Sequence, residues 1–487
     1  MPFDETNKGD PFRGDFPDWP DKEPWRELAE EVQRQADELA RRRYEPKARQ
    51  DYLRLLKERR RKRQEKLVDG QPERRADRKP DGTVTQFDFL PVQVGYDTLL
   101  VPGELLITHQ SYYGEHGRRR AKESLDALHI EATDVHCHAL RDRVLRLTPS
   151  AAMEPQDLAD VAKVLRTQEF EVSLSSIIPK AGVQKPPPDS PPPPPPSGSA
   201  VQQMAEVRAQ WSGRGRPVKV AIIDTGITPE MRTDGRLDTV PRGARFNDPL
   251  DVFPLPAGDG FLDFDAGHGT FVAGCVDQIA PGAQITVYRA TDTDGIASEV
   301  TVACEMIRAV KGDGAQIVNL SLGCQTQDDA PPIAIQAALE IIREWERETG
   351  RDVLVVAAAG NYADTRPCWP AAFREVVSVG GLAPDMQPTA WSTRGFWVTC
   401  STIGQGIVST YVEGRESPQV DPKSRAFGPN AWAVWIGTSF AAPQITGALA
   451  RLSQDEGISV RDALRKLLAA GRPIPDFGQA LRILPGI

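Results

Sequence analysis

VKVAIID, residues 218–224, is the stretch that decides the fold. It is an apolar run of strand length that ends on an acidic residue. Three similar runs follow, at ITVYRA (285–290), AQIVNLSLG (315–323) and DVLVVAAAG (352–360). Nearly continuous apolar runs are typical of strands in a parallel sheet that is buried on both faces. We therefore expect a mostly parallel sheet in the C-terminal part of the chain.

Helical segments separate the predicted strands. Residues 298–314 and 331–350 have apolar residues at helical spacing, and each segment ends at glycine, a common helix terminator. The alternation predicts a doubly wound α/β domain, which we place at residues 201–487. Ligands of such sheets bind at the carboxyl ends of the strands. Asp224 and Asn361 both follow a predicted strand at that edge.

Side chains capable of nucleophilic chemistry lie in three Gly-rich segments: Asp224 in VAIIDTG (220–226), His268 in GHGTFVAG (267–274) and Ser439 in GTSFAAP (437–443). The chain has six histidines, and His268 is the only one after residue 138. Any imidazole-assisted chemistry in this half therefore depends on His268. Structural roles are an alternative for each residue, because serine and aspartate cap helices and turns and a histidine at a helix start is usually structural.

The three segments resemble the active-site motifs of the subtilisin-like serine proteases, whose chain order Asp, His, Ser they share. Further stretches resemble the same family: NLSLG (319–323), AAAGN (357–361) and WPAAFREVVSVGG (369–381). The resemblance extends over about residues 201–470. It implies a subtilisin-like fold and a serine endopeptidase that hydrolyses polypeptide substrates.

The resemblance also implies a role for each matching residue. Ser439 would be the nucleophile, His268 the general base, and Asp224 the carboxylate that orients the imidazole. The side-chain amide of Asn361 and the backbone N–H of Ser439 would stabilise the oxyanion.

Substrate binding is implied in the same way. Ser321, Leu322 and Gly323 would bind an extended peptide as an added strand. Gly323 and Gly360 would leave room for the P1 side chain.

Residues 85–180 form a second unit. Their pattern predicts the order β-α-β-β-α-β, an α+β arrangement of the ferredoxin-like type. The unit resembles a subtilisin-type propeptide, which would act as an intramolecular inhibitor and lay residues 175–184 in the active-site cleft. A regulatory domain unrelated to propeptides is the alternative. We expect self-cleavage between about residues 176 and 215.

The remaining segments are an N-terminal extension, residues 1–84, and a Pro-rich linker, residues 181–200. The extension begins with a disordered stretch and continues as a charged helical segment, with thirteen Lys or Arg against four acids over residues 41–66. A solvated helix is the plain interpretation, and a basic arm for a protein partner or nucleic acid is the alternative. The net charge of −9 makes general nucleic-acid binding an unfavoured function.

Six scattered cysteines without a CxxC pair predict free thiols in a reducing compartment. The sequence shows no secretory signal and no apolar run long enough to span a membrane, so we expect a cytoplasmic protein without membrane contact. No cofactor or metal is required by the predicted chemistry. Calcium could serve as a structural ion near Asp259, Asp263 and Asp265, although the spacing is not that of an EF-hand.

Two classes of function remain. The first is an active endopeptidase, and the second is an inactive or permanently inhibited scaffold that only binds peptide. The presence of all three reactive residues together with Asn361 favours the enzyme.

Overall fold

The computed structural model describes residues 26–42, 54, 58, 92–94, 98–114, 117–179, 216–252, 258–418, 424–484 and 486. The predicted disordered start, most of the basic run at 41–66 and the Pro-rich linker lie outside these residues, and those interpretations remain predictions.

An eight-stranded sheet forms the centre of the C-terminal domain, in the order β17-β18-β12-β11-β10-β9-β6-β7. All neighbouring pairs are parallel except β17 and β18. The four apolar runs of the sequence form β6, β7, β9 and β10, so the predicted parallel sheet is confirmed. The strands are β6 (Lys219–Asp224), β7 (Gln284–Arg289), β9 (Ile317–Leu320), β10 (Leu354–Ala358), β11 (Val376–Leu382), β12 (Cys400–Ile403), β17 (Arg472–Ile474) and β18 (Gly478–Ala480).

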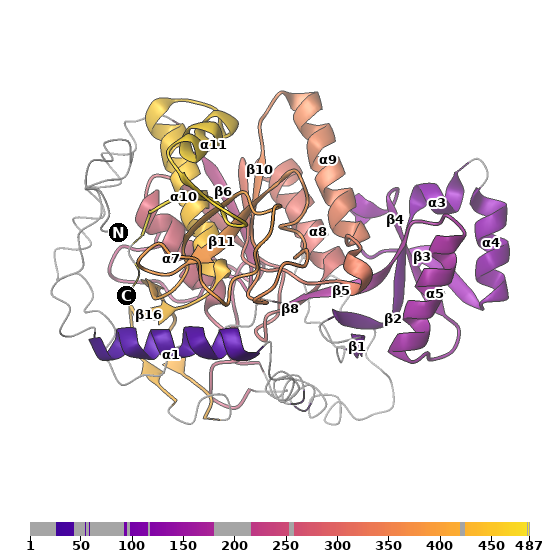
Figure 1. Ribbon diagram of the computed structural model, residues 1–487, viewed down its shortest axis with the longest axis horizontal. Coiled ribbons are helices and arrows are strands. Elements are labelled where there is room, and N and C mark those ends of the chain that lie inside the picture. The colour runs from indigo at the N-terminus through magenta and orange to yellow at the C-terminus, as the bar shows by residue number, and fades with distance from the viewer. Residues whose placement is uncertain are drawn as a thin grey trace.

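Helices cover both faces of this sheet (Figure 1). In β6, Val220 and Ile222 point into one core while Ala221 and Ile223 point into the other, as strand alternation requires. The domain is therefore doubly wound. The first face carries α7 (His268–Ile279), α10 (Thr438–Glu456) and α11 (Val460–Ala469); the second carries α8 (Glu299–Ile307), its continuation η2 (Arg308–Gly312), and α9 (Ile333–Thr349).

The N-terminal domain forms a separate lobe beside α8 and α9 (Figure 1). Its main strands are arranged β3-β4-β2-β5, with all neighbours antiparallel. From β2 onward its strands and main helices follow the order β-α-β-β-α-β. The elements are β1 (Val92–Val94), β2 (Thr98–Thr108), α3 (His109–Tyr113), α4 (Gly117–Ala127), β3 (Ile130–Asp134), η1 (His138–Leu140), β4 (Val144–Pro149), α5 (Pro155–Thr167) and β5 (Val172–Pro179).

The sheet of this lobe continues onto the C-terminal domain. Strand β5 pairs antiparallel with β8 (Ile296–Ser298), the short strand before α8. Apolar residues of both domains share one core cluster, including Leu106 and Val144 from the lobe and Val302 and Ile335 from α8 and α9. The two domains are therefore packed as one folded unit.

A disulfide crosses the same interface. Cys137, just before η1, is bonded to Cys304 in α8. The prediction that all six cysteines are free thiols is thus wrong for these two, because their pairing depends on a domain contact that no spacing in the sequence reveals. The other four cysteines, Cys275, Cys324, Cys368 and Cys400, are buried free thiols.

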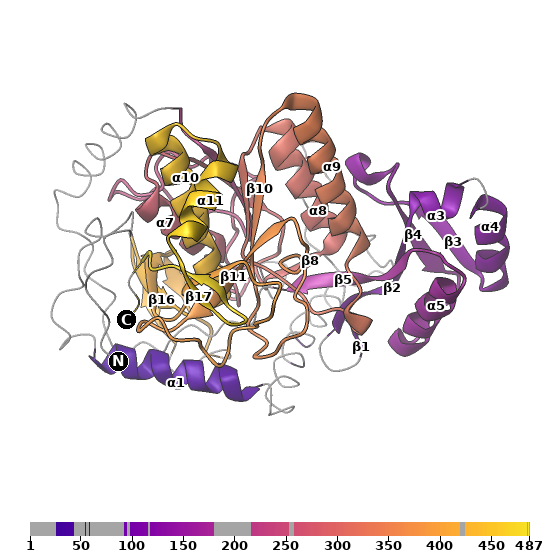
Figure 2. The same cartoon turned by 45° about the horizontal axis from the view of Figure 1, so that its top comes forward.

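Helix α1 (Arg26–Arg42) lies on the opposite side of the molecule, along the hairpin of β13 (Ile407–Thr410) and β16 (Trp432–Trp435) (Figures 1 and 2). Its Val32 packs against Trp432, and the Gln33 side chain accepts a 3.0 Å hydrogen bond from Gln405. The interpretation as a solvated helix is therefore wrong for this segment. Its apolar residues are few, but they are spaced to bury one narrow face. A further small hairpin joins β14 (Gly414–Arg415) and β15 (Ala426–Phe427).

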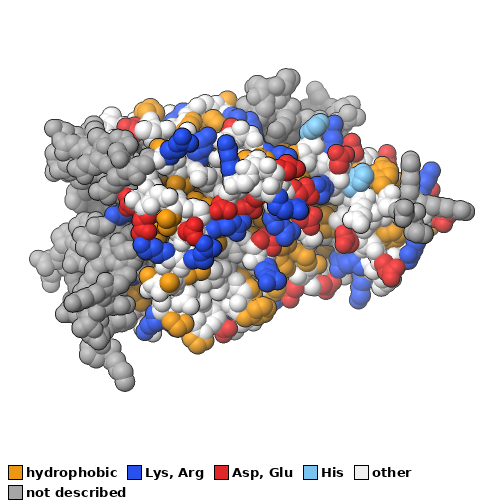
Figure 3. Space-filling model, turned by 90° about the horizontal axis from the view of Figure 1, so that it is seen from above, with side chains coloured by type: hydrophobic (Ala, Val, Ile, Leu, Met, Phe, Trp, Pro, Cys, Tyr) orange, Lys and Arg blue, Asp and Glu red, His pale blue; other side chains and the backbone are white. Residues whose placement is uncertain are grey.

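No helix in the described part of the chain is long and apolar enough to cross a membrane. On the face seen in Figure 3, acidic and basic side chains are interspersed over the described surface. Such mixed charge differs from the basic stripe that phosphate backbones require.

Glu299 is a buried carboxylate at the interface. Its two oxygens accept hydrogen bonds from the backbone N–H groups of Ser176 in β5 (2.8 Å) and Ala334 in α9 (2.9 Å). Burial raises the pKa of Glu299 to about 8; the two hydrogen bonds oppose this shift, and the neighbouring charge of Glu104 adds to it. While the two domains are packed together, the carboxyl group of Glu299 therefore favours its protonated form.

We predict that stability falls with rising pH because of Glu299. Its folded-state pKa lies above the ordinary value of 4.5, so the stability it contributes is complete below that value and is lost as the pH rises through about 8. Between about pH 5 and 8.5 the melting temperature of the parent chain should fall a few °C more than that of Glu299→Gln. Glu123→Gln, which removes an exposed carboxylate of α4, should behave like the parent. Parallel pH profiles for parent and Glu299→Gln would contradict the prediction.

Candidate active site

Asp224 and His268 meet where a strand ends and a helix begins. Asp224 is the last residue of β6 and His268 the first of α7. The imidazole Nδ1 lies 3.0 and 3.1 Å from the two carboxylate oxygens, and both side chains are fully buried. The backbone N–H of Thr225 also donates to Asp224, at 2.7 Å. A carboxylate in this position holds the proton on Nδ1 and leaves Nε2 to act as a base.

The contact depends on a glycine at the second position of α7. A Cβ on Gly269 would lie 2.2 Å from the backbone oxygen of Gly226 and 3.1 Å from Asp224 Oδ1. The backbone N–H of Gly269 donates to the Thr225 hydroxyl at 3.1 Å. The helix start is therefore pressed directly against the strand end, which brings His268 within reach of the carboxylate.

The imidazole is enclosed by aromatic rings. The ring centres of Trp435 and Phe440 lie 5.3 and 5.2 Å from that of His268. These apolar walls exclude water from the pair, and electrostatic interactions are stronger in such surroundings.

Ser439 lies at the N-terminus of α10, as its second residue. Backbone N–H groups in the first turn of a helix have no acceptor within that helix, so the N–H of Ser439 can serve an anion. The Ser439 hydroxyl donates to the backbone oxygen of Ser321 at 3.1 Å. In this side-chain orientation the hydroxyl proton of Ser439 therefore points at a backbone carbonyl and not at the His268 ring. A rotation about the Cα–Cβ bond is needed to redirect it.

Pro443 and Ser321 together fix the backbone of Ser439. A residue four positions after Ser439 would normally donate its N–H to the Ser439 carbonyl, but proline has no N–H. The Ser321 hydroxyl donates to that carbonyl instead, at 2.7 Å, and it accepts a 2.9 Å hydrogen bond from Asn319. Because α10 begins at Thr438, Pro443 is its sixth residue and lies beyond the first turn.

Asn361 is oriented by the residue before Ser439. The Asn361 Oδ1 atom accepts from both the backbone N–H (2.9 Å) and the hydroxyl (3.0 Å) of Thr438. The same hydroxyl accepts from the N–H of Gly360 at 3.0 Å. With Oδ1 held in this way, the amide NH₂ occupies the other end of the side chain, where it can act as a donor.

The space between Gly323 and Gly360 is occupied in part by a thiol. A Cβ added to either glycine would lie 2.7 or 2.8 Å from Cys368 Sγ. Cys368 is held there because the next residue, Trp369, exchanges two 2.8 Å backbone hydrogen bonds with Cys324. The expected strand addition of substrate to Ser321, Leu322 and Gly323 remains a prediction.

The acidic residues considered for calcium hold the loop before His268. Asp263 Oδ2 accepts from the backbone of Val252 (2.8 Å) and from the Thr293 hydroxyl (2.5 Å), and Asp259 accepts from Phe261 N–H (3.1 Å). Asp265 accepts at its carbonyl from His268 N–H at 3.1 Å. Among the residues that the structure describes, no three carboxylates, histidines or cysteines are arranged to hold a metal ion. A calcium site remains a prediction.

Sequence reasoning missed the residues that support this site. Thr225 and Thr438 stand next to Asp224 and Ser439 in their motifs, and a hydroxyl beside a reactive residue is a signal that could have been used. Asn319 and Cys368 gave no such signal, because their contacts arise only when separate strands and loops meet.

Comparisons with known proteins identify the family of this chain. The family model for the subtilase family matches residues 215–470, more than half of the chain. The minor extracellular protease Epr of Bacillus subtilis (strain 168) is 28% identical over 57% of this chain and 39% of its own length. The thermophilic serine proteinase of Bacillus sp. (strain AK1) is 28% identical over 51% of this chain and 55% of its own length. The chain thus spans about two fifths and about half the length of these relatives.

A solved structure shares the fold. Fervidolysin from Fervidobacterium pennivorans, a keratinolytic enzyme related to subtilisin, superposes with a TM-score of 0.53 at 18% identity. The match covers 81% of this chain and 61% of that one. It supports a subtilisin-like α/β architecture.

We predict that Gly269→Ala destabilises the domain and separates His268 from Asp224. The new methyl group would overlap the Gly226 oxygen, and overpacking of this kind costs about 1–3 kcal/mol. Urea unfolding in the Ser439→Ala background measures the change. Gly428→Ala is the matched control, because a Cβ there meets nothing within 4 Å, and it should change the unfolding free energy by less than about 0.5 kcal/mol. Equal stability of the two variants would show that the close contact is unimportant.

Proposed function

Because this chain belongs to the subtilase family of subtilisin-like serine proteases, we propose that it is an endopeptidase with Asp224, His268 and Ser439 as its catalytic residues. The observation that carries the proposal is the buried Asp224–His268 pair, with Nδ1 3.0 Å from the carboxylate, beside the helix N-terminus that bears Ser439. An isolated capping serine or core histidine would have no need of this arrangement.

In the proposed reaction, His268 Nε2 takes the hydroxyl proton of Ser439 as the oxygen attacks the substrate carbonyl. Asp224 stabilises the imidazolium that forms, and His268 then passes the proton to the leaving amine. The oxyanion would accept hydrogen bonds from the Ser439 N–H and the Asn361 amide, at the positive end of α10.

Substrate binding would also release the nucleophile. The Ser439 hydroxyl donates to the Ser321 carbonyl at 3.1 Å. A peptide that adds as a strand at Ser321 to Gly323 would offer its own N–H to that carbonyl. The Ser439 hydroxyl would then lose this acceptor and turn toward His268.

We propose that the N-terminal domain is a ferredoxin-like, propeptide-like inhibitor of this site. Its strand β5 pairs with β8, and Ile177 packs against Ile296. On the other side, the Thr98 hydroxyl donates to the Gln325 carbonyl at 3.4 Å, two residues beyond Gly323. The domain thus contacts β8 and the segment that follows Gly323 of the proposed cleft. Self-cleavage is expected between about residues 176 and 215, and residues 180–215 of this range lie outside the described residues.

The proposed partners are polypeptide substrates and the chain's own N-terminal domain. A protein partner for the rest of the N-terminal extension remains a prediction. The cytoplasmic location also remains a prediction, and the Cys137–Cys304 disulfide weighs against it because disulfides persist mainly in oxidising compartments.

The position of the Cys368 sulfur suggests which substrate side chains the site would accept at P1. Its sulfur lies against Gly323 and Gly360, between which the P1 side chain is expected to enter. A thiol at this position leaves a shallow space. We therefore propose a preference for small P1 residues.

Labelling with a fluorophosphonate tests the enzyme against the scaffold alternative. Protein freed of its N-terminal domain by limited proteolysis and reduction should carry the probe on Ser439, and Ser439→Ala treated in the same way should not react. Asn361→Ala should still label, and its kcat on a peptide should fall about 10²–10³-fold, the size expected for one lost oxyanion donor. Absence of labelling under every condition would identify the chain as an inactive scaffold.

A peptide series that varies only at P1 tests the role of Cys368. The parent should have its highest kcat/KM with Gly, Ala or Ser. Cys368→Gly should raise kcat/KM for Phe at P1 by at least about tenfold, in the range that pocket size usually controls. Cys400→Gly removes a buried thiol from β12 and should leave the preference unchanged. A parent that already prefers Phe would contradict the proposed pocket.

A further inference from the structure

The disulfide between Cys137 and Cys304 joins the two domains in addition to their backbone connection. The two residues are 167 positions apart, and their Cα atoms lie 5.9 Å from each other. Cys137 belongs to the N-terminal lobe and Cys304 to α8 of the C-terminal domain. The backbone segment that connects the domains, residues 180–215, therefore lies inside the loop that the disulfide closes.

We propose that this disulfide keeps the N-terminal domain attached after the connecting backbone is cut, so that release of the domain requires reduction of the bond. The inference deepens the regulation of the proposed site and rests on the proposed function of the N-terminal domain as its inhibitor. A single backbone cut between residues 180 and 215 leaves two fragments that are still covalently joined.

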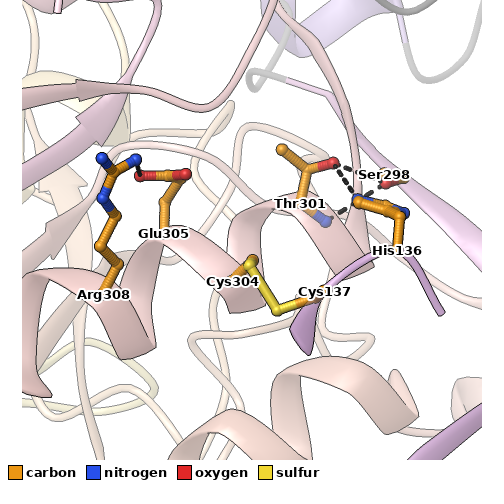
Figure 4. The surroundings of a disulfide bond; sticks show 7 residues. All are labelled: His136, Cys137, Ser298, Thr301, Cys304, Glu305 and Arg308. Atoms are coloured by element: carbon orange, nitrogen blue, oxygen red, sulfur yellow. Dashed lines mark hydrogen bonds and ion pairs between the residues drawn. A yellow bond between two sulfur atoms is a disulfide. The ribbon is translucent and has the colours of Figure 1, made fainter. Parts of the chain in front are cut away.

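Contacts around the bond keep the two sulfurs close (Figure 4). The His136 Nε2 atom lies 3.5 Å from the Thr301 hydroxyl, one turn before Cys304 on α8. Thr301 is held in turn by the Ser298 hydroxyl at 3.1 Å, in the strand that pairs with β5. On the far side of Cys304, Arg308 and Glu305 form an ion pair along the same helix, at 3.5 Å. The bond is thus part of the docked interface.

The docked interface also protects the bond from reductants. Cys137 is 1% exposed and Cys304 is 7% exposed. Val135 and Leu140, on either side of Cys137, are buried in the core that α8 and α9 share with the lobe. A dithiol reaches these sulfurs only when the lobe separates from α8, and such openings become more frequent once the backbone is cut.

The redox step needs one dithiol. Its first thiolate attacks one cysteine sulfur, the Cys137–Cys304 bond breaks, and a mixed disulfide forms while the other cysteine takes up a proton. The second dithiol sulfur then attacks the mixed disulfide, which closes the oxidised dithiol and releases the second cysteine as a thiol. Two electrons and two protons pass from the dithiol to the cysteine pair.

The disulfide would change the inhibition, because the cut N-terminal domain could rebind the C-terminal domain within the same molecule. A separate fragment dissociates and is diluted, whereas a tethered one stays at an effective concentration on the order of millimolar. The cut, bonded chain would therefore remain inhibited, and a second, chemically different signal would be required for activity.

A resin assay tests the tether without catalysis. The chain carries Ser439→Ala, a C-terminal affinity tag and a recognition sequence for a sequence-specific protease in the Pro-rich stretch 185–200. It is bound to the resin, cut, and washed for a long period with or without dithiothreitol. Nearly all of the N-terminal fragment should stay on the resin without dithiothreitol, and at least tenfold less should stay with it.

Two variants decide whether the bond is responsible. Cys304→Ser should lose the N-terminal fragment without any reductant, and Cys400→Ser, which changes a buried free thiol, should behave as the parent. A fragment that washes off the oxidised parent, or one that stays equally well after reduction or in Cys304→Ser, overturns the proposal.

A chain that keeps Ser439 and is cut in the same way tests whether activity requires reduction of the disulfide. Ser439 should react with a fluorophosphonate at least tenfold faster after reduction, and an equal rate before and after reduction overturns the regulatory role. If neither state reacts, the proposed peptidase function fails, and the retention assay still decides the tether.

Discussion

The structure depends on one close approach, between the end of a buried strand and the start of a buried helix. Asp224 and His268 lie at these two ends, and both are fully removed from water. A buried carboxylate is costly unless its oxygens are hydrogen-bonded, so this position requires both the imidazole and the backbone of Thr225. The contact exists only because Gly269 has no side chain. A stability requirement and the proposed catalytic geometry are therefore satisfied by the same three groups.

Ser439, the proposed nucleophile, is positioned by a hydrogen bond that replaces one missing from its helix. In most helices the carbonyl near the N-terminus is satisfied within the helix, but Pro443 prevents this for Ser439. The hydroxyl of Ser321, the residue that follows β9, supplies the missing hydrogen bond. Helix α10 is thus held in place at Ser439, the residue proposed as the nucleophile. Thr438 links the same helix to the Asn361 side chain, so one helix turn orients both proposed components of catalysis.

Much of this arrangement could be predicted because it depends on local signals. Continuous apolar runs predicted strands β6, β7, β9 and β10, and the Gly-rich motifs indicated Asp224, His268 and Ser439. The features that could not be predicted involve partners distant in sequence. The burial of helix α1 depends on a few apolar residues among many charges, and the pairing of Cys137 with Cys304 depends on how two domains dock. The orientation of the Ser439 hydroxyl depends on a choice between two acceptors, which no residue pattern encodes.

The N-terminal domain contributes to the packing of the molecule, and it also covers one edge of the C-terminal domain. Leu106 and Val144 belong to the same core cluster as α8 and α9, and β5 extends its sheet onto β8. Separating the domains would expose that apolar surface, and it would leave the buried carboxylate of Glu299 without the Ser176 N–H. Exposure of the carboxylate to water would at the same time relieve its desolvation, which makes separation easier at higher pH. The same interface therefore combines apolar burial that favours docking, a titrating group that opposes it, and a covalent bond that limits how far the domains can move apart.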